Sequence, residues 1–212
     1  MAFDLDGTLI HSVPDLAQAV DTVLRELRMA PLAEGSVAQL IGNGFEALLE
    51  RALALSMGRA ATDAEIDDAR ERFMRAYAER VFDRSSIYPA VLQTLDELAA
   101  AGLRVGCITN KSGRFALPLL EAAGLRERFD VVLSPQTASE RKPSPLLLQR
   151  ALAFWAIAPE QLLYVGDSHV DIGAARAAGT RVALVSYGYG RARHDQPPDW
   201  TVDSLSELRE LR

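Results

Sequence analysis

Phe3-Asp4-Leu5-Asp6-Gly7-Thr8-Leu9, near the beginning of the chain, is the stretch around which the rest of the sequence is organised. Along an extended strand the side chains of Asp4 and Asp6 would point to opposite faces. If the strand ends at Asp4 and Gly7 turns the chain, both carboxylates can face one site, where the glycine lets a ligand approach the backbone. Such a pair suits a reaction in which one carboxylate attacks and the other moves a proton. Only three residues precede Asp4, so either the first strand is unusually short or the natural chain begins upstream of Met1.

The composition is that of a folded, acidic protein. Of the 212 residues, 49% are hydrophobic and 25% are charged, which allows a full core and excludes a disordered chain. The net charge of −6 argues against a nucleic-acid or membrane surface, although a bound cation can still admit a small anionic substrate. The single cysteine, Cys107, cannot form a disulfide within the chain, and we recognise neither a signal peptide nor a membrane-spanning stretch. We therefore expect a cytoplasmic protein, and the sequence leaves monomer and homodimer open.

Residues 14–83 are expected to form a unit made only of helices. Ser12-Val13-Pro14-Asp15 has the pattern of a capping box, and apolar residues at helical spacing follow it. Ile41-Gly42-Asn43-Gly44 interrupts the helical pattern, and Thr62-Asp63-Ala64-Glu65 is a second capping box that begins another helix. No strand pattern is present in this segment, which is therefore predicted to be a helical insertion.

The flanking segments, residues 1–13 and 84–212, alternate between short apolar strands and amphipathic helices. This alternation is typical of a parallel sheet whose crossover helices cover both faces. We therefore predict an α/β fold: a Rossmann-like parallel sheet with helices on both faces, formed by residues 1–13 and 84–212, plus an inserted helical-bundle cap, residues 14–83. The predicted strands after the first cover residues 103–108, 129–133, 162–165 and 182–185, and the predicted helices cover 89–101, 112–123, 145–157, 170–178 and 204–211.

Polar residues that suit a phosphate group follow two of these strands. Thr109 and Asn110 stand between a strand and a helix, where a hydroxyl and free backbone N–H groups can bind phosphate, or simply cap the helix. Lys142 precedes a proline, which restrains the backbone, and can place its charge against a phosphoryl oxygen. Because ligands bind beyond the carboxyl ends of parallel strands, we expect these residues to lie close to Asp4 and Asp6.

A further stretch, Gly166-Asp167-Ser168-His169-Val170-Asp171, places two carboxylates one helical turn apart at a strand end. Carboxylate oxygens favour a hard cation, Mg²⁺ rather than Zn²⁺. The three histidines are scattered and do not form a zinc site; His169 is more typical of a surface or capping position than of a substrate contact, and His11 has no assigned role. The predicted metal-binding residues are Asp4, Asp6, Asp167 and Asp171.

These residues together suggest phosphoryl transfer. Asp4 would attack phosphorus to form an aspartyl-phosphate, and Asp6 would protonate the leaving oxygen and then deprotonate the attacking water. Mg²⁺ would be held by Asp4, Asp167 and the main-chain carbonyl of Asp6, with Asp171 orienting its waters. Thr109 and Lys142, the remaining predicted catalytic residues, would share the charge of the phosphate.

The four stretches FDLDGTL (3–9), TNK (109–111), RKP (141–143) and GDSHVD (166–171), in this order, resemble the haloacid dehalogenase-like hydrolase superfamily over nearly the whole chain. Within it, the longer stretches are similar to the phosphoglycolate phosphatase branch, which hydrolyses 2-phosphoglycolate with Mg²⁺. They are SVPDL (12–16), IGNG (41–44), ITNKSGRF (108–115) and LYVGDSHVDIGAARAAG (163–179).

The resemblance implies that Asp4 is the nucleophile and Asp6 the acid and base. It also implies that Gly42-Asn43-Gly44 is a loop of the cap that faces the site, although a plain helix-breaking turn would have the same sequence. Ser144 stands where the branch usually has a histidine after the Lys-Pro pair. The predicted phosphate- and substrate-binding residues are Gly7, Gly42, Asn43, Gly44, Thr109, Asn110 and Lys142.

The sequence disfavours three other functions and leaves one alternative open. A dehalogenase of this fold does not need Asp6, and a phosphonate-cleaving relative would need a lysine in residues 14–83, which contain none. A phospho-accepting signalling module would be shorter and would lack the helical insertion. A sugar-phosphate phosphatase, or a phosphotransferase resembling beta-phosphoglucomutase, shares the core chemistry and stays open as the alternative to 2-phosphoglycolate hydrolysis.

Overall fold

The computed structural model describes residues 1–211, and its centre is a six-stranded sheet in the order β5-β4-β1-β6-β7-β8. Every neighbouring pair in this sheet is parallel, which confirms the predicted α/β class. The first strand is short, but it is one of the two middle strands and pairs on both sides. The strands are β1 (Ala2–Phe3), β4 (Gly106–Ile108), β5 (Val131–Leu133), β6 (Leu163–Gly166), β7 (Arg181–Val185) and β8 (Trp200–Val202).

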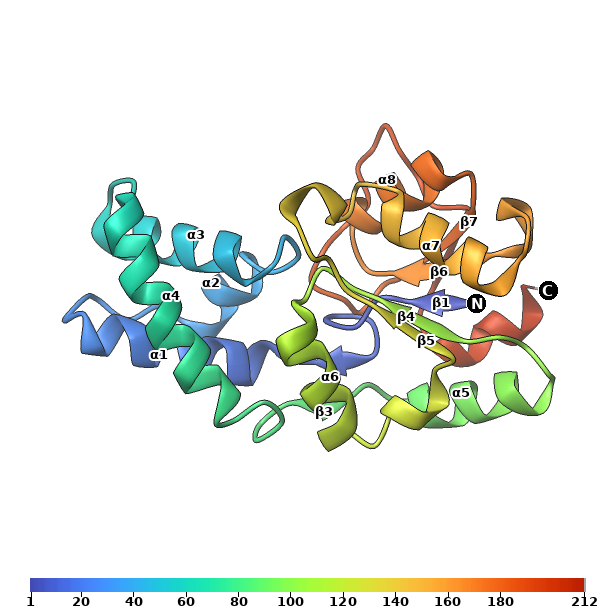
Figure 1. Cartoon of the computed structure of the whole chain (residues 1–212), viewed down its shortest axis with the longest axis horizontal. Helices are drawn as coiled ribbons and strands as arrows, with labels where there is room; N and C mark the ends of the chain where they lie inside the picture. Colours follow the sequence, from blue (N-terminus) through green and yellow to red (C-terminus); the bar gives the residue numbers. More distant parts are fainter. Residues whose placement is uncertain (212) are drawn as a thin grey trace.

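Helices cover both faces of the sheet, as predicted (Figure 1). The helices α5, α6 and η4 pack on one face in a cluster with Phe3 and Cys107, whereas α7 and α8 pack on the other in a cluster with Ala2 and Tyr164. Ala2 and Phe3 are adjacent in β1, so their opposite directions follow from the alternation of side chains along a strand. The bounds are α5 (Val91–Ala100), α6 (Gly113–Ala122), η1 (Arg126–Arg128), η2 (Ala138–Glu140), α7 (Leu146–Trp155), η3 (Pro159–Gln161), α8 (His169–Ala178) and η4 (Leu205–Glu210).

Four helices, α1 to α4, gather at the end of the molecule away from the six-stranded sheet (Figure 1). They enclose a hydrophobic cluster of their own, to which the α/β part contributes Phe115. This separate core supports our proposal that residues 14–83 form a cap on a core of residues 1–13 and 84–212. The helices are α1 (Val13–Glu26), α2 (Glu34–Ala38), α3 (Phe45–Met57) and α4 (Asp63–Ala78), and the two crossing segments pair as the antiparallel strands β2 (Ile10–His11) and β3 (Ser86–Ile87).

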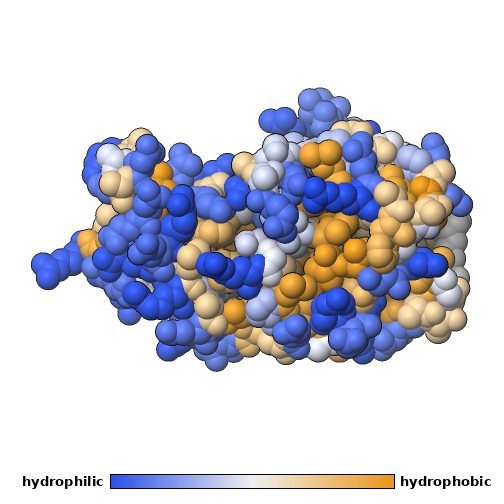
Figure 2. Space-filling view, in the orientation of Figure 1, coloured by the Kyte–Doolittle hydropathy of each residue, from blue (hydrophilic) through white to orange (hydrophobic). Residues whose placement is uncertain are grey.

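The outer surface of this helical part is polar, as Figure 2 shows for one face of the molecule. Glu26 of α1 forms ion pairs with two arginines of α4, Arg72 at 2.9 Å and Arg75 at 3.0 Å. The apolar sides of the helices meet inside, so charged side chains remain on the outside. Among residues 1–211 no helix is both long enough and apolar enough to cross a membrane.

The predicted capping box at Ser12 is wrong, although the one at Thr62 is confirmed. The Ser12 hydroxyl donates to Asp6 Oδ1 at 2.5 Å and does not cap α1. Asp15 instead accepts hydrogen bonds from the backbone N–H groups of residues 83–85. Ser and Asp are good cap residues because their short side chains hold an acceptor oxygen close to backbone N–H groups, and the same oxygen or hydroxyl can instead bind a partner that is distant in sequence.

The other differences concern short or irregular segments. Four elements were not predicted, α2, β2, β3 and β8, and β4 begins at Gly106, later than the predicted strand 103–108. The predicted terminal helix is the 3₁₀ helix η4. Strands of two or three residues carry too little periodicity to be recognised without their partners.

Candidate active site

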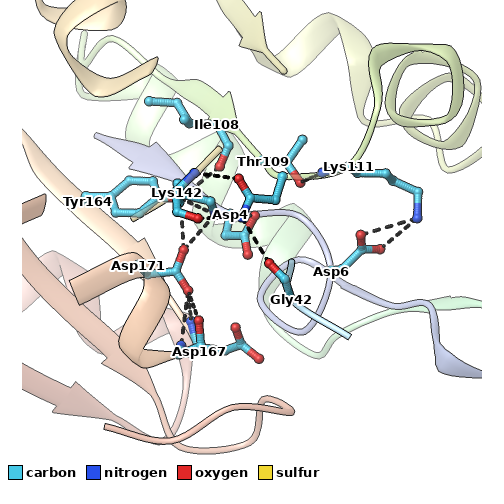
Figure 3. Close-up of polar contacts among 12 residues, drawn as sticks. Asp4, Asp6, Gly42, Ile108, Thr109, Lys111, Lys142, Tyr164, Asp167 and Asp171 are labelled. Carbon is cyan, nitrogen blue, oxygen red and sulfur yellow. Dashed lines mark hydrogen bonds and ion pairs between the residues drawn. The ribbon is translucent and has the colours of Figure 1, made fainter. Parts of the chain in front are cut away.

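Three segments that are distant in sequence meet at the carboxyl ends of the central strands. Asp4 directly follows β1, and its backbone N–H donates to the carbonyl of Val165 in β6 at 2.8 Å. Thr109 follows β4 on the other side of β1, and Asp167 follows β6. The parallel arrangement thus brings together the polar residues that the sequence placed at strand ends, as Figure 3 shows.

Lys142 lies between two carboxylates of this site. Its Nζ is 2.8 Å from Asp4 Oδ1 and 2.6 Å from Asp171 Oδ1, and it donates to the Tyr164 hydroxyl at 2.8 Å. Burial lowers the pKa of Lys142, but the charges of Asp171 and Asp4 outweigh this and raise it above its ordinary value. The ammonium therefore remains charged, and it fixes the direction of the Asp4 carboxylate.

Asn110 holds the backbone of Lys142 in place. Its side-chain oxygen accepts from the Lys142 N–H at 2.7 Å, and its amide nitrogen donates to the Lys142 carbonyl at 3.0 Å. The same nitrogen donates to the carbonyl of Gly42 at 3.0 Å. The Asn110 side chain thus binds backbone groups around the site and positions Lys142. Asn110 also lines the cavity described below.

Asp4, Asp167 and Asp171 form a buried carboxylate cluster. One oxygen of each lies within 4.8 Å of the others. Burial raises the pKa of Asp4 and of Asp167, and repulsion from the neighbouring carboxylates adds to the effect for both. Burial also raises the pKa of Asp171, but Lys142 and the hydrogen bonds of Ser168 outweigh it and the net shift is downward. Three buried oxygen ligands with unfavourable mutual charge fit a hard divalent cation such as Mg²⁺.

Asp167 is held by a glycine-rich loop that follows β7. Its Oδ2 accepts from the backbone N–H of Tyr189 at 2.7 Å and of Gly190 at 3.1 Å. A Cβ atom at Gly188 would lie 2.2 Å from the Cβ of Asp167, and one at Gly7 would lie 2.4 Å from its Oδ2. The predicted site residue Gly7 therefore makes room for Asp167, and the loop at 188–190 was missed although its two glycines were a signal.

The Asp6 side chain points to a different side of the site from the carboxylate cluster (Figure 3). Its Oδ1 accepts from the Ser12 hydroxyl at 2.5 Å, and its two oxygens lie 3.1 and 3.2 Å from the Nζ of Lys111. The Asp6 side chain therefore lies outside the carboxylate cluster, and its partners are Ser12 and Lys111.

Lys111 is a site residue that the sequence analysis did not assign. Its side chain is buried, and its Nζ lies 4.8 Å from the centre of the Tyr77 ring. Burial lowers the pKa of Lys111, but Asp6 and Tyr77 outweigh this and raise it. One feature of the sequence sets Lys111 apart: it and Lys142 are the only lysines among the 23 lysine and arginine residues.

A small cavity of about 40 Å³ lies between these residues and the helical part. Gly42 and Gly44 line it, whereas Asn43 is not among its lining residues, so the predicted loop contributes in part. His11 and His169 lie elsewhere: the His11 ring is 3.1 Å from the Tyr189 hydroxyl, and His169 is exposed at the start of α8. The other lining residues are Asp4, Asp6, Leu16, Ile41, Phe45, Leu48, Phe73, Tyr77, Thr109, Asn110, Lys111 and Phe115.

Comparison with known proteins gives a consistent result. The sequence model of a family described as haloacid dehalogenase-like hydrolase matches residues 1–185. A phosphoglycolate phosphatase of Nitrosococcus oceani is 41% identical over 210 residues, covering 98% of this chain and 93% of the relative. One of Nitrosospira multiformis is 39% identical over 210 residues, covering 98% and 92%. A crystal structure of a predicted phosphoglycolate phosphatase from Haemophilus somnus superposes with a TM-score of 0.93 at 33% identity, covering 99% and 96%.

Proposed function

Because the chain belongs to the haloacid dehalogenase-like hydrolase family, we propose that it is a phosphatase that hydrolyses 2-phosphoglycolate through a phosphorylated Asp4. The chain covers more than nine tenths of two relatives that carry the name phosphoglycolate phosphatase. The observation that carries the mechanism is the position of Asp4. One of its oxygens lies 2.8 Å from the Lys142 ammonium, and its carboxylate belongs to a cluster that suits one divalent cation.

In the first step an oxygen of Asp4 forms a bond to phosphorus, and the bond between phosphorus and the ester oxygen of the substrate breaks. The departing oxygen takes a proton from Asp6, which lies two residues further along the same turn. Lys142 holds the Asp4 carboxylate in a fixed direction and, with Thr109, faces the negative charge of the transferred group. The product glycolate then leaves.

In the second step a water molecule attacks phosphorus and gives its proton to Asp6. The bond between phosphorus and the Asp4 oxygen breaks, which releases phosphate, returns Asp4 to its carboxylate and leaves Asp6 protonated, as it was before the first step. Ser12 and Lys111 hold the Asp6 side chain through both steps.

Asp4, Asp167 and the main-chain carbonyl of Asp6 are the groups that would hold Mg²⁺, and Asp171, whose oxygens bind Lys142 and Ser168, would orient its waters. When bound, the cation offsets the charges of the phosphate and of the carboxylates, which otherwise repel each other. A cytoplasmic location is part of the same proposal, in keeping with the buried, unpaired thiol of Cys107.

Phosphate release from a panel of small phosphomonoesters tests the function. We expect 2-phosphoglycolate to have the highest kcat/KM and glucose phosphates to be poor substrates. A requirement for a bisphosphate activator, with little free phosphate produced, would instead identify a mutase and overturn the proposal.

A further inference from the structure

We propose that Lys111 and Tyr77 form a subsite for the carboxylate of the substrate. This inference rests on the proposed function, since it assumes that the phosphoryl group lies against Asp4. It adds to that function the residues that distinguish 2-phosphoglycolate from a phosphomonoester without an acidic group.

The cavity next to Asp4 has one source of positive charge. Among its lining residues within 1–211, Lys111 is the only cationic side chain, and Asp4 and Asp6 are the anionic ones. Aromatic and aliphatic side chains such as Phe45 and Phe115 form much of the remaining wall. In such an apolar environment a single buried ammonium interacts strongly with an anion, because little water screens the charge.

The Lys111 ammonium has room for a second acceptor. Its hydrogen bonds within the described chain go to the two oxygens of Asp6, at 3.1 and 3.2 Å. An ammonium has three N–H donors. The side chain is 6% exposed, so an additional acceptor has to come from a ligand in the cavity rather than from bulk solvent.

Tyr77 supplies a second, independent observation. It is 1% exposed and lines the same cavity, and its hydroxyl has no hydrogen-bond partner among residues 1–211. Leaving a buried hydroxyl without a partner is unfavourable, so such groups in folded proteins usually bind a ligand or water. The Lys111 ammonium lies 4.8 Å from the centre of the Tyr77 ring, and both residues line the same cavity.

The position of Asp6 explains why this subsite would receive a carboxylate. Asp6 has to reach the ester oxygen in order to protonate it, and in 2-phosphoglycolate one methylene group joins that oxygen to the carboxylate. The carboxylate is therefore carried next to Asp6, where Lys111 lies. An ionised carboxylate can accept hydrogen bonds but cannot donate them, whereas Lys111 and Tyr77 can both donate.

The experiment compares 2-phosphoglycolate with ethyl phosphate, in which a methyl group replaces the carboxylate. The measured quantity is the ratio of the two kcat/KM values for each variant. Any effect of a substitution on Asp6 or on phosphate binding acts on both substrates and cancels in this ratio. For Lys111→Met we expect the ratio to fall about 100-fold, because the variant loses a buried charged hydrogen bond to one substrate only.

Tyr77→Phe provides the second test, because it removes one hydroxyl and leaves the ion pair of Lys111 with Asp6 intact. We expect the ratio to fall about tenfold, because only 2-phosphoglycolate has a carboxylate that could accept from the Tyr77 hydroxyl. Arg114→Met is the matched control: it removes an exposed cation from α6 outside the cavity, and the ratio should equal that of the wild type. Lys111→Arg, which keeps the charge, should recover part of the loss.

An unchanged ratio in Lys111→Met and Tyr77→Phe would overturn the inference and leave Lys111 with the role of holding Asp6. If Lys111→Met does not fold, judged by its circular dichroism, Tyr77→Phe decides alone. A wild-type protein that hydrolyses both substrates equally well would also overturn the subsite while leaving the phosphatase intact. A wild-type protein that releases phosphate from neither would contradict the proposed function itself.

Discussion

The Nζ of Lys142 lies 2.6 Å from Oδ1 of Asp171, and both side chains are 1% exposed. The pair joins the loop after β5 to the first turn of α8, and the Tyr164 hydroxyl binds both members. A buried ion pair of this kind contributes little net stability, but removing one partner leaves a charge that water cannot reach.

Replacement of Lys142 by methionine should therefore destabilise the protein. We expect the free energy of unfolding, measured with urea in the presence of EDTA, to fall by about 3–5 kcal/mol, because Asp171 and Asp4 lose their counter-charge. Adding Asp171→Asn to this variant should recover part of the loss. Arg70→Met, which breaks the exposed pair with Asp67, should cost about 1 kcal/mol or less. If Lys142→Met and Arg70→Met lower the free energy of unfolding equally, the buried carboxylates do not depend on Lys142 for their counter-charge.

Binding of a divalent cation should stabilise the folded protein. The three clustered carboxylates repel one another in the folded state, and a bound cation removes that repulsion. At a concentration 100 times the Kd, Mg²⁺ should add about 2.7 kcal/mol to the free energy of unfolding and raise the Tm accordingly. NaCl at equal ionic strength is the control. EDTA should abolish phosphate release, and Mg²⁺ should restore it better than Zn²⁺; full activity without metal would refute the site.

Asp15 connects the two segments that join the helical part to the sheet. Its carboxylate accepts hydrogen bonds from three successive backbone N–H groups, those of Asp83, Arg84 and Ser85, and from the Ser85 hydroxyl. Asp15→Ala should lower the free energy of unfolding by about 1–3 kcal/mol, because these bonds to a charged group are lost.

The matched control for Asp15 is Asp21→Ala on the same helix, which removes a partly exposed pair with Arg25. Its cost should be about 0.5 kcal/mol or less. Thermal unfolding of both variants gives the comparison, and similar melting temperatures would show that the contacts of Asp15 with residues 83–85 contribute nothing to stability.

The loop after β7 should be intolerant of side chains at Gly188. A Cβ there would lie 2.2 Å from the Cβ of Asp167, so Gly188→Ala has to displace that carboxylate. We expect the Mg²⁺ affinity, measured by calorimetry, to fall about tenfold or more, since displaced supporting contacts commonly cost that much. Gly35→Ala, where a Cβ meets nothing within 4 Å, should leave the affinity unchanged. A Gly188→Ala protein with wild-type affinity would show that Asp167 does not need this loop.

Much of the site could be predicted because parallel strands have a common carboxyl edge. Once Asp4, Thr109 and Asp167 were assigned to strand ends, their proximity followed from the sheet alone. Lys142 was harder, because it lies well beyond the end of β5, and its identity as a site residue depended on the Lys-Pro pattern.

The remaining features depend on contacts that no local pattern carries. Asp15 has the sequence context of a helix cap, but its partners are nearly seventy residues away. Lys111 is one of only two lysines in the sequence, yet only the fold shows that it contacts Asp6 and Tyr77. The loop at 188–190 contains no charged residue and binds Asp167 through backbone N–H groups, so its two glycines are the only trace of this role in the sequence.

The central claim is that Asp4 accepts the phosphoryl group, and the direct test is the turnover of 2-phosphoglycolate by Asp4→Asn. We expect kcat to fall by at least about 10⁴-fold, because an amide cannot replace the attacking carboxylate, with circular dichroism like that of the wild type. In acid-quenched wild-type reactions, radiolabelled phosphate should be attached to the peptide that contains Asp4. An Asp4→Asn protein that keeps appreciable turnover, or label found on a different peptide, would contradict the account.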